Sequence, residues 1–312
     1  MAGVDGYLEK GKDAGGWTGT ARHGKDGENG GDGWMQAADI LVMGATGKVG
    51  RLMHAHWQGT GLRALWQGRS SGAAPGWVAW HPGQPLPPVR VVLVLSGVTS
   101  GDAAALAMNR RIGLEVAEAA VAAGVGCVLM ASTMAVYGRT PPQGAAEETA
   151  PDHPNPYGIA KLEAEQALAA RLQGGGTAAC ALRLGNVAGA DMLGTVVAQG
   201  RRVALDQFPD GTGPVRSYVG PGMLARVVAG LTRRVLDGQR LPPVLNVAGQ
   251  APVAMAGILA AAGLPFDWQP AGPQAVQRVA MECSRLAGLV PPRPEQETPA
   301  ALAAEWREAA RP

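Results

Sequence analysis

Short apolar runs alternate with stretches of helical periodicity from Asp39 to Gly185. Apolar runs of strand length predict strands buried on both faces, and apolar positions three and four apart predict the helices that cover them. The predicted strands are residues 40–43, 62–66, 77–80, 91–95, 127–130 and 178–184, and the predicted helices are residues 48–57, 103–123 and 157–172. Because strands alternate with helices, we expect an α/β fold with a doubly wound parallel sheet.

The pattern loosens after Gly185. A helix at residues 221–236, a strand at 244–247 and an alanine-rich helix at 251–262 predict a smaller lobe beside the sheet. Between the second and fourth predicted strands the chain is short and rich in proline, which leaves little room for a crossover helix. We therefore expect that side of the sheet to be shortened and to lack a full crossover helix.

Residues 1–37 are rich in Gly, Asp and Lys and show no periodicity. A segment of this composition buries too little apolar surface to offset the entropy of ordering, so it is predicted to be a disordered tail. Since Met35 stands just before the first strand, an upstream start codon is an alternative explanation for residues 1–34.

Three glycines with the spacing Gly44-x-x-Gly47-x-x-Gly50 follow the first predicted strand and open a helical pattern. Glycine lets the backbone approach a ligand closely, and the positive end of the following helix stabilises a pyrophosphate. The spacing in this context predicts a dinucleotide site of Rossmann type, with a tight structural turn as the alternative. Residues 38–185 are then the expected dinucleotide-binding core. Residues 186–312 are mainly a substrate lobe, with late strands and helices returning to the core.

Composition narrows the function classes. The formal charge of +2 and the scattered Lys and Arg argue against nucleic acid or an anionic membrane as a partner. Cys127, Cys180 and Cys283 stand far apart, so neither a disulfide framework nor a metal site is expected. The apolar runs are too short to span a bilayer and no leader pattern is present, so we expect a soluble cytoplasmic protein.

Tyr157 and Lys161 lie four residues apart at the start of a predicted helix, after Asn155-Pro156. Positions i and i+4 share one helix face, and a nearby cation favours the phenolate, which makes the phenol a usable acid or base. Ser132 and Thr133 follow the fifth strand, at the sheet edge where open α/β sheets bind ligands. Their hydroxyls can bond a substrate oxygen, although capping of a turn is the alternative.

The order Gly-x-x-Gly-x-x-Gly, Ser-Thr-x-x-Val-Tyr-Gly and Tyr-x-x-x-Lys resembles the extended short-chain dehydrogenase/reductase family, which contains nucleotide-sugar epimerases and dehydratases. The resemblance runs through residues 38–305. Further agreeing segments are Ser96-Gly97, Asn109 in the long helix, and residues 182–189, 210–219 and 283–292.

This resemblance implies roles for individual residues. Tyr157 is the expected acid/base, Lys161 lowers its pKa and binds the nicotinamide ribose, and Thr133 polarises the substrate, with Ser132 in reserve. The implied cofactor contacts are Gly44, Thr46, Gly47, Lys48, Val49, Gly50, Ser96, Gly97, Asn109, Ser132, Tyr157 and Lys161. The implied substrate contacts are Thr133, Asn186 and Arg216, although Arg216 is alternatively a solvated loop arginine. The family often forms a homodimer through the two long helices.

Three departures from the family pattern affect these expectations. No carboxylate follows the second strand; Arg69 stands there with Ser70 and Ser71, which favours NADP over NAD, with an exposed arginine on a solvated turn as the alternative. The usual His and Asp are absent from residues 218–224. The usual adenine-contacting Asp is absent from residues 71–88, where tryptophans line an adenine pocket or, alternatively, simply pack on the sheet.

We therefore expect an NAD(P)-dependent oxidoreductase of the epimerase/dehydratase type that acts on a hydroxyl or carbonyl of a nucleotide-sugar-like substrate. Met134 and Ala135 follow Thr133 where a dehydratase needs a carboxylate, which argues against dehydration. The alternatives are an NADPH-dependent reductase of a small carbonyl compound, a non-catalytic dinucleotide-binding protein and a structural subunit.

Overall fold

Seven parallel strands form the central sheet in the computed structural model, which describes residues 38–68 and 74–309. Their order is β11-β6-β5-β4-β1-β2-β3. The strands are β1 (Ala38–Met43), β2 (Ala64–Gly68), β3 (Trp77–Ala79), β4 (Val89–Val94), β5 (Cys127–Thr133), β6 (Ala178–Leu184) and β11 (Val244–Val247). The chain builds outward from β1 in one direction and then from β4 in the other, so the strand order reverses at these two strands, which is where open α/β sheets bind ligands.

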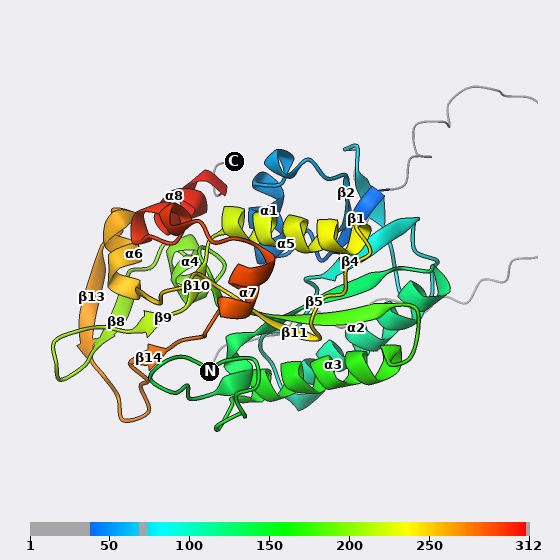
Figure 1. The fold of residues 1–312 in the computed structure, drawn as a ribbon. Helices are drawn as coiled ribbons and strands as arrows, with labels where there is room; N and C mark the ends of the chain where they lie inside the picture. The colour runs from blue at the N-terminus through cyan, green and yellow to red at the C-terminus, as the bar shows by residue number, and fades with distance from the viewer. Residues whose placement is uncertain (1–37, 69–73, 310–312) are drawn as a thin grey trace, which may run out of the picture. The chain divides into compact units, whose positions relative to one another are not determined.

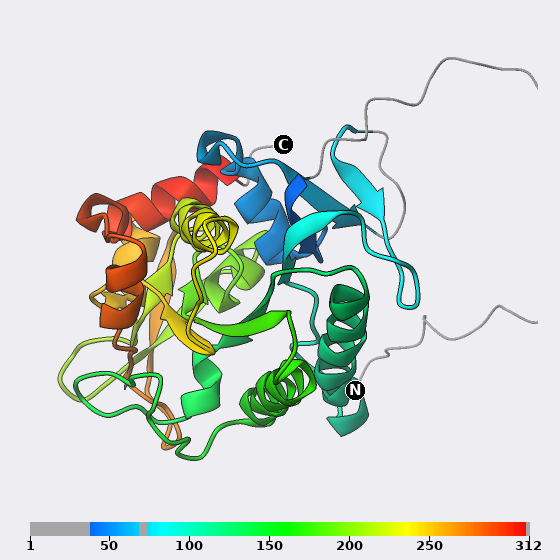
Figure 2. The same ribbon diagram turned by 45° about the vertical axis from the view of Figure 1, so that its right-hand side comes forward.

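Helices cover both faces of this sheet, as a doubly wound fold requires (Figure 1). On one face lie α1 (Lys48–Ala55) and α5 (Pro221–Leu236), and on the other lie α2 (Ala103–Ala122) and α3 (Pro156–Leu172). Figure 2 shows α2 and α3 side by side on their own face. Short 3-10 helices follow α1 and β5, namely η2 (Gln58–Thr60) and η3 (Met134–Tyr137).

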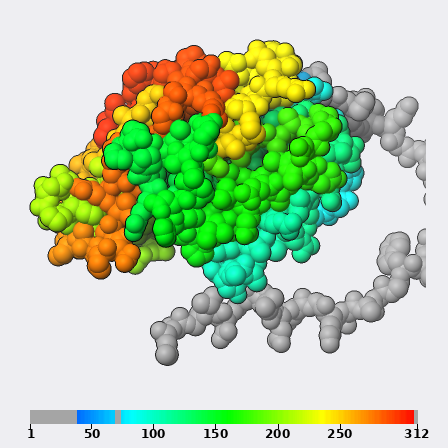
Figure 3. Space-filling view, turned by 60° about the horizontal axis from the view of Figure 1, so that its bottom comes forward, coloured from blue at the N-terminus to red at the C-terminus, as the bar shows by residue number. Residues whose placement is uncertain are grey.

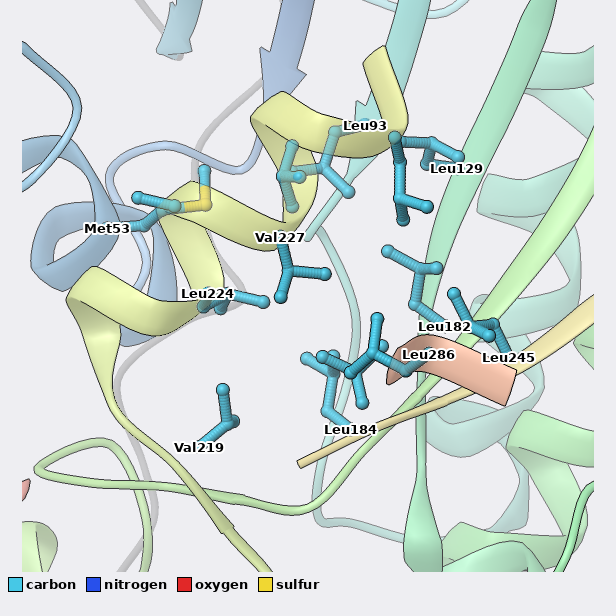
Figure 4. Close-up of a cluster of buried hydrophobic side chains, with 14 of the residues drawn as sticks. Met53, Leu93, Leu129, Leu182, Leu184, Val219, Leu224, Val227, Leu245 and Leu286 are labelled. Atoms are coloured by element: carbon cyan, nitrogen blue, oxygen red, sulfur yellow. The ribbon is translucent and has the colours of Figure 1, made fainter. Parts of the chain in front are cut away.

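The central strands alternate their side chains between two hydrophobic cores. Ile40 and Val42 enter the core beneath α1 and α5, and Leu41 and Met43 enter the core beneath α2 and α3. Figure 4 shows Leu224 and Val227 of α5 facing leucines of the strands in the first of these cores. Burial on both faces explains why these strands read as continuous apolar runs.

A smaller lobe is built mainly from the chain after β6. Its strands are β7 (Asn186–Val187), β8 (Val203–Gln207), β9 (Val215–Arg216), β10 (Tyr218–Val219), β12 (Val253–Ala254), β13 (Phe266–Pro270) and β14 (Arg278–Val279). Its helices are α4 (Met192–Ala198), α6 (Met255–Ala261), α7 (Ser284–Leu289), η4 (Pro294–Gln296) and α8 (Pro299–Ala309). A third apolar cluster, which includes Leu193, Leu205 and Trp306, holds this lobe together.

The predicted α/β fold with a doubly wound parallel sheet is confirmed. Strands 178–184 and 244–247 and helix 221–236 begin and end as predicted. The predicted helix at 251–262 is shorter, because Val253 and Ala254 pair with β9 as strand β12 before the helix begins. The sheet is trimmed at its β3 edge, since no helix connects β3 to β4 among the described residues.

Two expectations fall on parts of the chain outside the described residues, namely the predicted tail at 1–37 and the cofactor contact at Arg69. Of the tryptophans considered for an adenine pocket, Trp66 and Trp80 are buried, and Trp66 packs edge-on against Trp57. They are therefore core residues. No helix in the described ranges has the length and apolar character needed to cross a bilayer.

Candidate active site

The glycine turn after β1 requires its glycines. Gly44 has φ of 76°, and a Cβ there would lie 2.6 Å from the backbone nitrogen of Ser96 at the end of β4. A Cβ on Gly50 would lie 2.6 Å from the backbone of Ala45, where α1 packs on the strand end. The helix begins after Gly47 without a side-chain cap, so its first N–H groups remain available to an anionic ligand.

Neighbouring side chains hold this turn. The Gly44 N–H donates to Oε1 of Gln67 at 3.0 Å, which ties the turn to the end of β2. The Lys48 ammonium donates to Oγ1 of Thr195 on α4 at 2.8 Å. Lys48 and Thr46 are both exposed beside the turn. Gln67 was not among the predicted contacts, because it acts through a bond to the backbone of a residue 23 positions earlier.

The end of β4 lies beside Lys161. A Cβ on Gly97 would lie 2.9 Å from Oδ1 of Asn109 and 3.9 Å from the Lys161 ammonium. The buried Asn109 side chain accepts a hydrogen bond from the Val98 N–H at 3.1 Å and donates to the Val98 carbonyl at 2.8 Å. Asn109 therefore shapes the strand end, and the missing side chain of Gly97 leaves space in front of the ammonium.

Lys161 is 4% exposed, and burial lowers its pKa to about 8, against an opposing effect of the Glu165 carboxylate. Within residues 38–68 and 74–309 its ammonium donates no hydrogen bond. Its three donors are therefore available to a ligand. The space beside Gly97 and the uncapped helix after Gly47 together fit a dinucleotide that presents a ribose hydroxyl to Lys161 and a pyrophosphate to the turn.

Tyr157 enters the site from the first turn of α3. This helix begins at Pro156, and the side chain of its N-cap Asn155 accepts a hydrogen bond from the Gly158 N–H at 2.8 Å. A Cβ on Gly158 would lie 2.2 Å from the Ala135 carbonyl oxygen. The helix start thus presses directly on η3, two residues after Thr133, and brings Tyr157 next to the end of β5.

The pKa of Tyr157 differs from the sequence-based expectation. We expected Lys161 to lower it, but burial raises the pKa of the phenol. The Lys161 pKa is itself lowered by burial, so both groups are displaced toward their neutral forms. A tyrosine held in this way is suited to donate a proton rather than to stand as a phenolate.

The two hydroxyls at the end of β5 have different surroundings. Oγ1 of Thr133 accepts a hydrogen bond from the Ala135 N–H at 3.2 Å, which leaves its own proton free for a substrate oxygen. Ser132 is buried and donates to the Glu165 carboxylate on α3. The Ser132 hydroxyl therefore faces α3, and Thr133 is the hydroxyl left at the strand end.

A buried polar network beneath these residues was not anticipated from the sequence. Arg183 donates to both oxygens of Glu165, at 2.8 Å for the closer one, and lies 4.9 Å from the centre of the Tyr137 ring. The Tyr137 hydroxyl donates to Oδ1 of Asn246 at 2.6 Å. The only local signal was Glu165 at the next i+4 position after Lys161.

The predicted substrate residues lie in the smaller lobe. The Arg216 guanidinium donates to the carbonyls of Val215, Gln277 and Val276 at 2.8, 2.9 and 2.7 Å. It therefore ties β9 to the 276–277 loop. Asn186 opens β7 as the strand partner of Tyr218, whose hydroxyl donates to Asp191 at 2.7 Å.

Near Arg216, a hollow of about 470 Å³ lies between the segment after η3 and the 273–278 loop. Its lining includes Arg139, Thr140, Phe208, Gln277 and Arg278, with no carboxylate among them. In Figure 3 the green segment that follows η3 lies against an orange segment from the C-terminal part of the chain. A bond of 3.1 Å from the Ala280 N–H to Oγ1 of Thr140 joins the two.

Comparisons with known proteins give a partial family match and a shared fold. The sequence profile described as the NAD dependent epimerase/dehydratase family matches residues 91–207. No curated protein matched the sequence.

Solved structures share the fold at low sequence identity. The UDP-glucose 4-epimerase from Brucella ovis in complex with NAD has a TM-score of 0.71 and 19% identity, over 86% of this chain and 96% of that chain. MoeE5 in complex with UDP-glucuronic acid and NAD has a TM-score of 0.68 and 20% identity, over 87% and 99%. The UDP-N-acetylglucosamine 4-epimerase from Methanobrevibacter ruminantium M1 in complex with UDP-N-acetylmuramic acid has a TM-score of 0.70 and 17% identity, over 88% and 99%. The chain therefore shares the fold of these solved structures, and its residues 91–207 match the profile of the NAD dependent epimerase/dehydratase family.

Proposed function

We propose that this protein is an NAD(P)-dependent oxidoreductase of the epimerase/dehydratase type that acts on a hydroxyl or carbonyl group of a nucleotide sugar. The observation that carries the proposal is the placement of Lys161: its side chain is buried, and its ammonium lies beside the small residue Gly97, one turn after Tyr157. An ammonium carries three donors, which are suited to the hydroxyls of a bound ribose. The position of Lys161 between the ends of β4 and β5 is where a nicotinamide ribose fits.

Each residue has a role that follows from its placement. Tyr157 moves the proton of the reacting hydroxyl, because it is the half-buried acid at the start of α3. Thr133 donates its free proton to the same oxygen and stabilises charge that develops there. Lys161 stabilises the phenolate when the proton has left. When bound, the nicotinamide supplies the hydride acceptor and donor.

The hollow lined by Arg139, Phe208 and Arg278 supports the substrate class. Two arginines without a carboxylate suit the phosphates of a sugar nucleotide, and an aromatic ring suits a base. UDP sugars are bound in neighbouring structures of this fold. Epimerisation is favoured over dehydration, because Met134 and Ala135 supply no carboxylate beside Thr133.

We propose NADP as the preferred cofactor. Gln67 and Gly68 end β2 without a carboxylate to accept hydrogen bonds from the adenosine ribose, and the cationic Arg69 follows. The MoeE5 and Brucella ovis epimerase structures contain NAD, so the preference is a property to be tested on this chain. Titration with NADPH and NADH, followed by intrinsic tryptophan fluorescence, should give the lower Kd for NADPH. An equal or lower Kd for NADH would remove this preference.

The catalytic proposal is tested with Tyr157→Phe. The variant keeps the ring and loses the proton, so cofactor binding should stay within about twofold while turnover of a UDP sugar falls at least about 10²-fold. Ile159→Ala, which truncates an exposed side chain on the same turn, is the control and should keep full activity. Cofactor binding with no hydride transfer in the unaltered protein would instead indicate a non-catalytic binding protein.

One observation favours a second candidate, the reductase of a small carbonyl compound. The Arg216 guanidinium is occupied by three backbone carbonyls, so it offers little to a diphosphate. Thermal-shift measurements with UDP-, GDP- and dTDP-sugars separate the two. A rise in melting temperature with a sugar nucleotide supports the epimerase. Turnover of simple aldehydes without such a rise supports the reductase.

A further inference from the structure

Gln67, near the end of β2, reaches the glycine turn from the neighbouring strand. Because β1 lies between β4 and β2 in the sheet, the turn that follows β1 has a strand end on either side. On the β2 side, Oε1 of Gln67 accepts a hydrogen bond from the Gly44 N–H at 3.0 Å, and the Gln67 carbonyl accepts one from the Ala45 N–H at 3.3 Å. One residue therefore holds two successive N–H groups of the turn.

The Gln67 side chain is also fixed by its amide nitrogen. Nε2 donates to the carbonyl of Gly68 at 2.8 Å and to that of Trp80, directly after β3, at 3.1 Å. The three side-chain bonds fix the orientation of the amide, because exchanging its O and N would set a donor against an N–H group and an acceptor against two carbonyls. A glutamate of the same length could not make this set of bonds, since an ionised carboxylate has no donor for the two carbonyls.

The N–H groups around the turn consequently have two different tasks. Gly44 and Ala45 direct theirs to Gln67, whereas the N-terminus of α1, which begins at Lys48, has no side-chain cap. The turn connects β1 directly to α1, so its conformation decides where the N–H groups at the helix start point. Gly44 adopts φ of 76°, in a region that glycine enters freely, so this conformation depends on the contacts that hold it.

From these contacts we infer that Gln67 is a positioning residue for the dinucleotide, which holds the glycine turn in the conformation that presents the start of α1 to the pyrophosphate. A turn that is already held loses less conformational entropy when a ligand binds. The inference rests on the proposed function, because it takes a dinucleotide as the ligand of the turn. Gln67 acts through the backbone of Gly44 and Ala45 and not through the reacting groups.

Gln67→Met tests the inference, because methionine has nearly the length of glutamine and loses all three side-chain hydrogen bonds. The Kd values of NADPH and NADH should each rise about tenfold, as expected when a backbone donor loses its acceptor and the turn must be ordered on binding. At saturating cofactor kcat should stay within about twofold, because Tyr157, Lys161 and Thr133 are unchanged. Quenching of tryptophan fluorescence gives the Kd values, and steady-state kinetics gives kcat.

A second readout needs no cofactor. Hydrogen exchange of the peptide that covers residues 38–50, followed by mass spectrometry, reports on the Gly44 and Ala45 N–H groups. Exchange should be faster in Gln67→Met, while a peptide that covers β5 should exchange as in the unaltered protein. This comparison separates a local effect on the turn from a general loss of stability.

Two further variants complete the test. Gln84→Met is the matched control, because Oε1 of Gln84 accepts from the His81 N–H at 2.9 Å in the loop after β3, which is its one side-chain bond within the described part of the chain. This variant should change neither the exchange of the turn nor the Kd values. Gln67→Asn is measured if Gln67→Met does not fold; its amide is one methylene too short to span from Gly44 to Trp80, so the same changes are expected.

The inference is supported if exchange of the turn and both Kd values rise in the Gln67 variants alone while kcat holds. It is overturned if a folded Gln67 variant exchanges the turn at the unaltered rate, or if faster exchange leaves both Kd values unchanged. Should the unaltered protein bind neither dinucleotide, the proposed function fails and the ligand part of the inference fails with it, but hydrogen exchange still decides whether Gln67 holds the turn.

Discussion

Glu305 of α8 places a carboxylate at the N-terminus of α5, where the helix has no side-chain cap of its own. The Gly222 N–H donates to Oε2 of Glu305 at 2.9 Å. A Cβ on Gly220 or Gly222 would lie 2.1 or 2.9 Å from the same carboxylate. This acceptor comes from a segment about 80 residues later in the chain.

Substitutions at Glu305 separate hydrogen bonding from charge. Burial raises the pKa of Glu305, so its ionised form is less favourable in the folded protein, although the N–H group and the helix end oppose this. Stability should therefore fall as pH rises through the window above its unfolded value of about 4.3. Glu305→Gln should remove this slope and be no less stable at pH 7.

Glu305→Ala should be less stable by about 1 kcal/mol, because the Gly222 N–H loses its acceptor. Urea unfolding at pH 4 and pH 7 measures these differences. Glu308→Ala, which truncates an exposed carboxylate on the same helix, should change little. A Glu305→Ala variant as stable as the unaltered protein at both pH values would contradict the account of this contact.

Individual residues could be predicted from the sequence where a short motif defines them. The three glycines, Tyr157 and Lys161 have a local spacing that the chemistry requires, and the structure brings their segments together. Gln67 and Glu305 could not be predicted, because each acts through a bond to a backbone group distant in sequence. The burial of Lys161, on which its pKa depends, likewise arises only when α3 packs against the segment after β4 that carries Gly97.

At the scale of elements, the packing of α3 on η3 sets the position of the reactive tyrosine. Gly158→Ala would place a methyl group 2.2 Å from the Ala135 carbonyl, so either the helix start or η3 must shift. We expect a loss of about 2 kcal/mol in stability and a drop in kcat, because Tyr157 moves relative to Thr133.

Gly113→Ala is the matched helical control. Its new Cβ would lie 3.5 Å from the Met130 sulfur, which is ordinary contact, and alanine is the better helix former by about 1 kcal/mol. The control should be equally or more stable, with unchanged kcat. Denaturant unfolding and steady-state kinetics give both quantities. Equal stability of the two variants would show that the contact between α3 and η3 is not tight.

Elements were predictable where local signals and burial agree. Asn155-Pro156 and Pro221 mark helix starts. The apolar runs of the inner strands have the length and composition that predict strands buried on both faces. The prediction failed at residues 251–254, where pairing of β12 with β9 overrides a local helical pattern. It also missed that β5 continues to Thr133, since Ser132 and Thr133 are held in the strand by pairing with β6.

At the scale of the whole molecule, α2 and α3 form one outer face of the sheet (Figure 2). Met108, Val121 and Ile159 are large apolar side chains exposed on these two helices, at 38%, 44% and 45%. Two such helices from each of two chains would form a four-helix interface of the kind that the family resemblance implies. A stable interface needs roughly 800 Å² from each partner, which two helices of this length can provide.

We therefore expect a homodimer in solution, with about twice the chain mass of 31.9 kDa by size-exclusion chromatography with light scattering. The double variant Val121→Lys/Ile159→Lys places like charges on both sides of the two-fold axis and should give monomers at micromolar concentration. Leu236→Lys is the control, because Leu236 is 38% exposed but lies at the end of α5 on the opposite face. If the control dissociates and the double variant does not, the interface lies on the α5 face. A monomeric unaltered protein would mean that these side chains do not mediate self-association.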